Sequence, residues 1–524
     1  MRSISSYLLL NERFILSCLK KVKIILNLDY IPQGNIMPFV GFNYMALRRV
    51  AVLDESLIMF GGKHRNPVLC AILTLLNLTL LFTGCNVPKA HLTTFNKHFE
   101  MGDYESSALF AQKKIGQREN PAGEDLLWAL QLGTVERIRQ NYQKSTEYFD
   151  KSEEMLKYYD EQSNVGDVIG STVASDNVIP YRGEEYDGVM VNTYKALNFM
   201  AEGKMDLARV EFNRALDRQR RAKEKFSKEI DKLNSELEQK QQENEFSKSN
   251  VENPTTRDLL AQKYPNLYNF QAYPDFVNPF ATYLAGIYFN LVGDHSKAVD
   301  LLKESYGMVG DNPYIADDLS TTEKILDGKA RLENTVWLIF ENGLGPVKKE
   351  FRLDIPLFVA TDKIKYVGIA LPKLELRNKS HPYLLVNSDD KEYTTLPVAD
   401  MDRVVQTEFS KDFGGILIRA IISATAKAAA QYVIKQQGSN AATALSFAVA
   451  AYSFASTAAD VRIWTALPKD FQIARFPKPK NGKLKITPPG SVPIDVDIPQ
   501  CNNAVVYVRI ITNQAIPVYN VMAF

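Results

Sequence analysis

The sequence predicts an α+β multidomain protein, in which a helical solenoid precedes a β-sandwich-like domain that carries an Ala-rich helical hairpin insertion. Three observations predict it. Between residues 85 and 330, apolar side chains recur with the spacing of a helix face, and short Gly-containing turns separate paired helices. From about residue 331 onwards, the pattern changes to short apolar runs bounded by Gly and Pro, which is typical of strands. Inside this second half, about residues 403–460 return to a helical, Ala-rich pattern.

Composition excludes some functions. The 524 residues are long enough for two or three domains, and the net charge of +1 does not favour nucleic acid, whose phosphates need a basic surface. Four cysteines and five histidines are too few and too scattered for a disulfide framework or a zinc site. The chain has no G-x-S-x-G, G-x-x-x-x-G-K-[ST] or H-E-x-x-H motif. We therefore expect no enzyme, no catalytic residue, no cofactor and no metal.

The first element in chain order is a signal-like segment, "MFGGKHRNPVLCAILTLLNLTLLFTGC", at residues 59–85. Lys63 and Arg65 give it a positive start, and an apolar run from Val68 to Phe82 follows. A charged start, a short apolar run and a small-residue end are typical of a secretory signal. The run is shorter than the roughly 20 apolar residues that a transmembrane helix needs.

The end of this segment resembles the bacterial lipobox. Gly84 precedes Cys85, although Phe82 stands where Leu is usual, and Asn86 follows where an Asp would indicate retention at the inner membrane. The resemblance implies that the Cys85 thiol receives a diacylglycerol and becomes the mature N-terminus. We therefore expect a lipid anchor at the periplasmic face of the cell outer membrane. The alternative is a buried apolar helix with an ordinary core cysteine.

This interpretation divides the N-terminal region. Residues 59–84 would be the lipoprotein signal peptide, with a start at Met59 and with Met37 and Met45 as further candidate starts. Residues 1–58 would then be an upstream extension that comes from a start placed too early.

Between residues 90 and 330, several segments share one pattern: a helix, a tight turn, and a second helix with Ala where the two approach. The turns fall at Gly102-Asp103-Tyr104, at Gly203 and at Gly293-Asp294, and a weaker copy has Asn141-Tyr142 at its turn. The pattern resembles the tetratricopeptide repeat, whose unit of about 34 residues stacks into a solenoid. The resemblance implies a concave face that binds a peptide or a partner helix. A non-repetitive helical bundle is the alternative.

One helix of this region continues far beyond its repeat. Between Phe212 and Leu237, one set of side chains, polar in its middle and apolar elsewhere, recurs at spacings that alternate between four and three residues. This spacing is typical of a heptad seam. We expect a coiled-coil-like hairpin over about residues 206–275, with residues 255–275 folding back onto the seam. Another copy of the chain is the alternative partner.

In the C-terminal half, residues 331–524, Asn342-Gly343 separates two apolar runs, and this pair of residues is a strong signal for a hairpin. Further strands are predicted at residues 365–376, 383–388, 471–476, 482–487 and 504–512. The pattern of the helical insertion predicts two helices joined at Gly438-Ser439-Asn440. Because small residues allow close packing, we expect the hairpin to be buried in the domain or in a subunit interface, with membrane contact as the alternative.

A stretch from residue 459, "ADVRIWTALPKDFQIARFPKPKNGKLKI", resembles an uncharacterised family of bacterial periplasmic lipoproteins. The resemblance rests on an Asp-x-Arg-x-Trp-x-x-Leu-Pro segment, here Asp460, Arg462, Trp464, Leu467 and Pro468. It implies a repeat-type N-terminal half and genes near a lipoprotein that activates penicillin-binding proteins. Asp460 and Arg462 are expected to form a structural ion pair.

These expectations favour a protein-binding scaffold or adaptor in cell-envelope assembly, held at the membrane by Cys85, with unknown periplasmic protein partners and possible oligomerisation. Two alternatives stay open. One is an oligomeric export or pore-associated component, and the other is a cell-wall hydrolase with an unfamiliar site.

Overall fold

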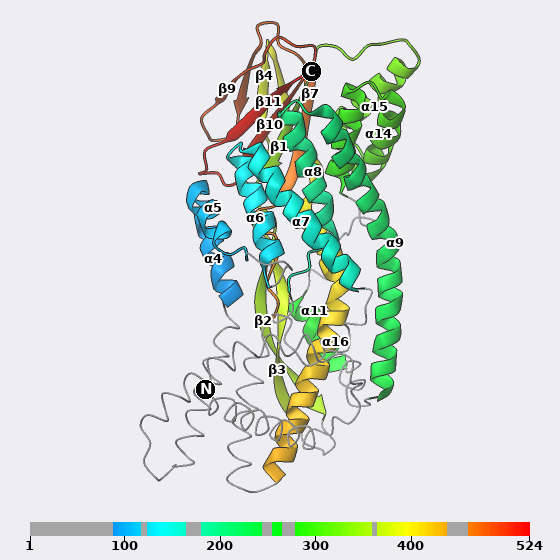
Figure 1. The fold of residues 1–524 in the computed structure, drawn as a ribbon, viewed down its shortest axis with the longest axis vertical. Helices are drawn as coiled ribbons and strands as arrows, with labels where there is room; N and C mark the ends of the chain where they lie inside the picture. The colour runs from blue at the N-terminus through cyan, green and yellow to red at the C-terminus, as the bar shows by residue number, and fades with distance from the viewer. Residues whose placement is uncertain are drawn as a thin grey trace, which may run out of the picture. The chain divides into compact units, whose positions relative to one another are not determined.

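The structure is a computed structural model, shown in Figure 1. It describes residues 87–116, 123–163, 180–243, 254–264, 278–358, 364–436 and 459–524. Cys85, the signal-like segment at residues 59–84 and the extension at residues 1–58 lie outside the described residues, and so does the second half of the Ala-rich hairpin. Eleven helices and eleven strands make up the described part, so the fold is mixed helix and sheet.

Four pairs of helices form most of the N-terminal half. They are α4 (Val87–Glu100) with α5 (Tyr104–Gln112), α6 (Asp125–Ile138) with α7 (Tyr142–Ser163), α8 (Glu185–Ala201) with α9 (Met205–Glu243), and α13 (Pro279–Leu291) with α14 (His295–Val309). Successive pairs also touch, because α5 packs on α6, α7 on α8, and α9 on α13. A further helix, α15 (Pro313–Leu326), packs on α14.

All four pairs turn with the same backbone geometry. The second residue of each turn donates its N–H to the carbonyl five positions earlier: Asp103 to His98, Asn141 to Glu136, Lys204 to Phe199, and Asp294 to Phe289. The residue before each donor has a positive φ, and it is Gly102, Gln140, Gly203 and Gly293 in turn. Glycine adopts this conformation without strain, which is why it ends three of the four first helices.

Inside the pairs, small residues permit close approach. Gly133 of α6 faces α7 so closely that a Cβ there would lie 2.6 Å from the ring of Phe149. Ser145 of α7 also donates its hydroxyl to the Gly133 carbonyl at 2.8 Å. The α6–α7 crossing is therefore set by a glycine as well as by the apolar faces.

The first part of the heptad seam on the long helix α9 packs against another helix of the same chain, α13. The ring of Phe212 lies 4.8 Å from that of Tyr288, and Gln219 donates to the Thr282 hydroxyl, both on α13. A short helix, α11 (Pro254–Lys263), follows, and the Tyr264 ring beyond it contacts Phe351. The fold-back of residues 255–275 onto the far part of the seam stays a prediction.

The strands form three sheets. The first has the order β11-β10-β1-β7-β6, the second β5-β4-β8-β9, and the third is the β2-β3 ribbon. Their bounds are β1 (Thr335–Asn342), β2 (Val347–Phe358), β3 (Ile364–Glu375), β4 (Leu385–Ser388), β5 (Lys391–Thr394), β6 (Leu396–Asp400), β7 (Asp470–Pro477), β8 (Lys483–Thr487), β9 (Ile494–Asp497), β10 (Ala504–Ile510) and β11 (Val518–Ala523).

The predicted hairpin at Asn342-Gly343 is wrong. Strand β1 pairs in parallel with β10 and antiparallel with β7, whereas β2 pairs with β3. Gly343 donates its N–H to the carbonyl of Ile510 at the end of β10, so the chain runs on beside β10 instead of reversing. The Asn342 side chain faces inward, where its oxygen accepts from the Ser380 hydroxyl at 2.6 Å.

The five predicted strands beyond the hairpin correspond to β3, β4, β7, β8 and β10. Sequence analysis missed β5, β6, β9 and β11. Three of these strands have only four or five residues, and β6 also contains Pro397 and a bulge.

Strand β1 shows how the layers are arranged, because every one of its residues is buried. Val336, Leu338 and Phe340 belong to the apolar core shared with the four-stranded sheet, as a sandwich requires. Trp337 and Ile339, on the opposite face, belong to the core that contains the helix pairs. The five-stranded sheet is therefore the middle layer between the four-stranded sheet and the helices. Figure 1 labels the strands and helices of these layers.

The Ala-rich insertion begins with one long helix, α16 (Met401–Gln436), which starts directly after β6 and packs on β3. The predicted joint at Gly438-Ser439-Asn440 and the second helix lie outside the described residues. Among the helices that the structure describes, none has both the length and the apolar character needed to span a membrane.

Candidate functional site

The Asp460–Pro468 segment lies between the helix pairs and the middle sheet. The Arg462 Nε and Nη2 atoms donate to the two carboxylate oxygens of Asp460 at 2.8 and 2.7 Å. The Arg462 residue is 2% exposed, whereas the Asp460 side chain is 29% exposed. The pair thus gives the buried Arg462 guanidinium a bidentate carboxylate partner, as in a structural ion pair.

The middle of the segment is bonded to helix α6. The Trp464 indole N–H donates to the Thr134 hydroxyl at 3.0 Å. Gln131 donates to the Thr465 hydroxyl at 2.8 Å and accepts the Ala466 N–H at 3.1 Å. Since Gln131, Trp464 and Ala466 are each at most 1% exposed, this contact is structural and is not a surface for a partner.

The segment ends against the loop that follows β1. The Leu467 carbonyl accepts the Gly345 N–H at 2.8 Å, and a Cβ on Gly345 would lie 3.0 Å from the Pro468 carbonyl oxygen. Leu467 is 1% exposed, and β7 begins two residues after Pro468. Residues 460–468 therefore connect α6, the loop after β1 and β7.

The predicted turn residues lie at the ends of helices, and they are not brought together into one site. Asp103 accepts the Ser106 N–H at 3.1 Å and so caps α5, while Tyr104 packs its ring against Phe99. Asp294 accepts from Arg209 at 3.2 Å, which links the α13–α14 turn to α9. These residues shape the helix pairs.

A buried polar cluster that sequence analysis missed lies where α6 and α8 meet β1 and β10. The two carboxylate oxygens of Glu341 accept the hydroxyls of Tyr194 and Tyr507, each at 2.6 Å. Burial raises the pKa of both tyrosines well above the ordinary value, and the negative Glu341 adds to the increase. Both phenols therefore remain protonated donors across the physiological range.

Two arginines flank this carboxylate. Arg137 of α6 donates to the Asn198 side-chain oxygen at 2.7 Å, and its guanidinium lies 4.8 Å from the centre of the Tyr507 ring. Arg509 of β10 places its Nε 3.5 Å from a Glu341 oxygen. The cluster thus combines two guanidinium groups with one carboxylate.

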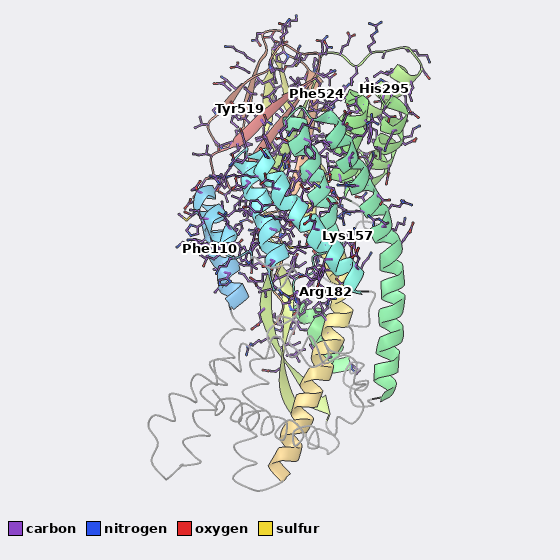
Figure 2. All side chains as sticks on the ribbon, in the orientation of Figure 1. Phe110, Lys157, Arg182, His295, Tyr519 and Phe524 are labelled. Carbon is purple, nitrogen blue, oxygen red and sulfur yellow. The ribbon has the colours of Figure 1, made fainter. Side chains whose placement is uncertain are left out.

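A small pocket opens beside this cluster. It is lined by the end of α6, the start of α7, the end of α8 and the strands β1, β10 and β11. Arg137, Glu341 and Arg509 supply its charged wall. Tyr519, which Figure 2 labels on β11, belongs to the lining and accepts a hydrogen bond from the Gln140 side chain at its carbonyl.

The sequence held a usable signal for this cluster. Arg509 stands inside the apolar run "AVVYVRII", and Glu341 directly follows the run "TVWLIF". A charged residue in a buried strand needs a partner, so each pointed to a polar contact. The identity of the partners depends on pairing between segments far apart in the chain, which spacing does not reveal.

Within the residue ranges that the structure describes, no three His, Cys, Asp or Glu side chains are grouped so as to hold a metal ion.

Comparisons with known proteins give little further information. No family model matches the chain, and no curated protein matches it. Among solved structures, the chain is similar to a tetratricopeptide repeat protein from Parabacteroides merdae, with 10% identity over 45% of this chain and 98% of that chain and a TM-score of 0.13.

Proposed function

We propose that the chain is a non-enzymatic protein-binding scaffold whose helix pairs form a tetratricopeptide-like stack. The observation that supports this is the repetition of one turn geometry in four helix pairs, together with the packing of each pair on the next. Stacked helix pairs build an extended surface to which each unit adds a similar face, and such surfaces bind extended peptides or partner helices.

Several large apolar side chains remain exposed on these helices. Leu109 of α5 is 48% exposed, and Leu207 and Val210 of α9 are 47% and 43% exposed. Because Leu207 and Val210 are three positions apart, they share one face of α9. They are suitable first positions at which to look for a partner.

The proposal includes a lipid anchor at Cys85 that places the protein at the periplasmic face of the outer membrane, with a role in cell-envelope assembly. Support comes from the charged start, the apolar run and the Gly-Cys end of residues 59–85. Helix α4 begins at Val87, two residues after Cys85. A lipid on that sulfur would therefore hold the first helix pair close to the membrane surface, with no spanning helix.

The anchor and the scaffold have separate tests. For the anchor, cells are fed a labelled fatty acid, and we expect label on the wild-type chain and on Cys501→Ala but none on Cys85→Ala. Label that persists in Cys85→Ala, or that never appears, would disprove the anchor.

For the scaffold, a photo-crosslinking amino acid replaces Leu207 or Leu109 in intact cells. Val492, which is 83% exposed after β8, serves as the control position. We expect discrete crosslinked proteins from the helix positions and none from position 492. An equal set of products from all three positions would argue against the proposed binding surface.

A further inference from the structure

The pocket at α6, α7, α8, β10 and β11 carries unbalanced charge. Its charged lining consists of Arg137, Arg509 and Glu341, which amounts to two cations and one anion. Both oxygens of Glu341 already accept tyrosine hydroxyls at 2.6 Å. The single carboxylate therefore cannot complete the hydrogen bonding of two guanidinium groups, which together have ten N–H donors.

The hydrogen bonds of Arg509 show where donors are left over. The residue is 3% exposed, and its Nη2 donates to the Ala466 carbonyl at 3.3 Å. Its Nε and Nη1 are buried and have no hydrogen-bond partner in the part of the chain that the structure describes. The Nε is 3.5 Å from Glu341, a distance that gives electrostatic attraction without a good hydrogen bond.

Arg137, the second arginine of the lining, also has a donor that forms no hydrogen bond within the described ranges. It is 8% exposed and its Nη1 is taken by Asn198. Its guanidinium lies over the rings of Tyr194 and Tyr507, but its Nε has no hydrogen-bond partner among the described residues. An unmet buried donor destabilises a protein, and it does so more strongly when it is charged. Two such groups at one pocket indicate a site whose anion is supplied from outside the chain.

The planar guanidinium donors and the apolar lining of the pocket indicate which class of anion it can bind. A guanidinium presents its donors as a planar fork that fits a carboxylate or a phosphate oxygen pair. The remaining walls include Leu197, Ala201, Val518 and Met522, which are apolar. An organic anion with an aliphatic body can bury carbon against these walls, whereas a free phosphate cannot and would have to lose more hydration.

We infer that this pocket binds a carboxylate that carries a short aliphatic group, with Arg509 and Arg137 as its cationic partners. The carboxylate can belong to a free short-chain acid or to the C-terminus of a peptide that ends in a small apolar residue. The inference does not depend on the scaffold proposal, since it concerns one pocket and one chemical group.

The test measures binding to the full-length protein by titration calorimetry. The probes are butyrate, acetate, inorganic phosphate, and the peptide acetyl-Val-Ala with either a free or an amidated C-terminus. We expect saturable binding of one ligand per chain, tighter for butyrate than for acetate or phosphate. Tighter binding of the free-acid peptide than of butyrate would identify a peptide terminus as the source, and the reverse order would identify a free acid.

Two variants connect any binding to this pocket. Arg509→Gln removes the guanidinium whose Nε and Nη1 have no hydrogen-bond partner among the described residues, and it is expected to weaken binding at least tenfold. Ala201→Leu leaves all three charges in place and fills the half-buried apolar wall, so it is expected to weaken binding to a similar extent even if the first variant folds poorly. Arg220→Gln, at an exposed arginine of α9, is the matched control and should bind like the wild type.

Three outcomes would overturn the inference. They are no saturable binding of any carboxylate, phosphate binding as tight as that of butyrate, and binding that Ala201→Leu leaves unchanged.

Discussion

The side chain of Lys195 on α8 is 2% exposed, and its ammonium is surrounded by carboxylates from two neighbouring helices. Its Nζ lies 2.7 Å from Asp150, 2.8 Å from Glu153 and 3.1 Å from Glu211. Burial alone would raise the pKa of Glu153, but the hydrogen bonds from Lys195 and Asn192 outweigh it and lower that pKa to about 2. The cation therefore holds together α7, α8 and α9.

We predict that Lys195→Met destabilises the protein by about 2–3 kcal/mol, because it removes the buried cation between the three helices, whereas Arg214 and Arg218 still compensate part of the charge of Glu153 and Glu211. Denaturant unfolding of the full chain measures the change. The matched control is Lys329→Met, since Lys329 forms an exposed ion pair with Asp327 and should change stability by less than about 1 kcal/mol. Equal effects of the two substitutions would contradict this account.

Asp187, at the start of α8, predicts a pH dependence of opposite sign to that of Glu153. It is fully buried, and burial raises its pKa to about 7, although bonds from the Glu184 N–H and the Tyr181 hydroxyl act to lower it. Between pH 4 and pH 7 the folded state therefore holds a proton that the unfolded state releases. This group's contribution to the free energy of unfolding falls as the pH rises through that window.

We predict that Asp187→Asn is close to neutral at pH 4 and stabilises the protein at pH 8 by an amount on the order of 4 kcal/mol, which corresponds to the rise of its pKa to about 7. Asparagine keeps an oxygen that can accept from Tyr181 and Glu184, and it never ionises. Denaturant unfolding at the two pH values gives the comparison, with the exposed Asp300→Asn on α14 as control. The same effect of Asp187→Asn at both pH values would show that the buried acid does not titrate as described.

At the scale of elements, the helix pairs depend on backbone conformation at their turns. Gly293 has a φ of 83°, and nothing lies within 4 Å of the position where its Cβ would be. We predict that Gly293→Ala costs about 1–2 kcal/mol, because only conformational strain is added. Gly307, inside α14 and equally uncrowded, is the matched control: Gly307→Ala should stabilise by about 0.5–1 kcal/mol. Thermal unfolding that shifts in the same direction for both would contradict this reasoning.

The helix pairs were predictable from sequence because their signals are local. Periodic apolar residues and a glycine that ends the first helix act within about 30 residues of each other, and even the Gln140 turn keeps the common geometry. The pairing of β1 was not predictable in this way. Its partner β10 lies more than 160 residues away, and the local Asn342-Gly343 signal indicated the wrong neighbour.

The candidate pocket has the same limitation. Arg137, Glu341 and Arg509 come from three distant segments, and none belongs to a recognisable motif. The sequence shows that Glu341 and Arg509 are charged residues beside or within apolar runs. It does not show that they lie close to α6. The Asp460–Pro468 segment was found from resemblance, and its bonds to Gln131 and Thr134 emerged only from the structure.

At the scale of the whole molecule, the five-stranded middle sheet depends on the layers that pack against its two faces. Trp337 and Ile339 are completely or almost completely buried, and the core to which they belong is formed largely by the helices. The Trp337 indole also donates to Asp318 of α15 at 2.9 Å. Removing residues 85–330 would expose these groups and leave the indole without its carboxylate partner. The boundary at residue 331 is thus a change of secondary structure that cuts through a shared core.

We predict that residues 331–524, produced alone, do not form a native domain, because one face of the five-stranded sheet loses its apolar cover. The isolated fragment is expected to aggregate or to bind a hydrophobic dye without a cooperative thermal transition. In the intact chain, far-UV circular dichroism and tryptophan fluorescence should report one coincident transition for the described helices and sheets, since both share that core. A soluble fragment that melts cooperatively and has dispersed amide resonances would instead show that the sandwich core of Val336, Leu338 and Phe340 suffices to fold it.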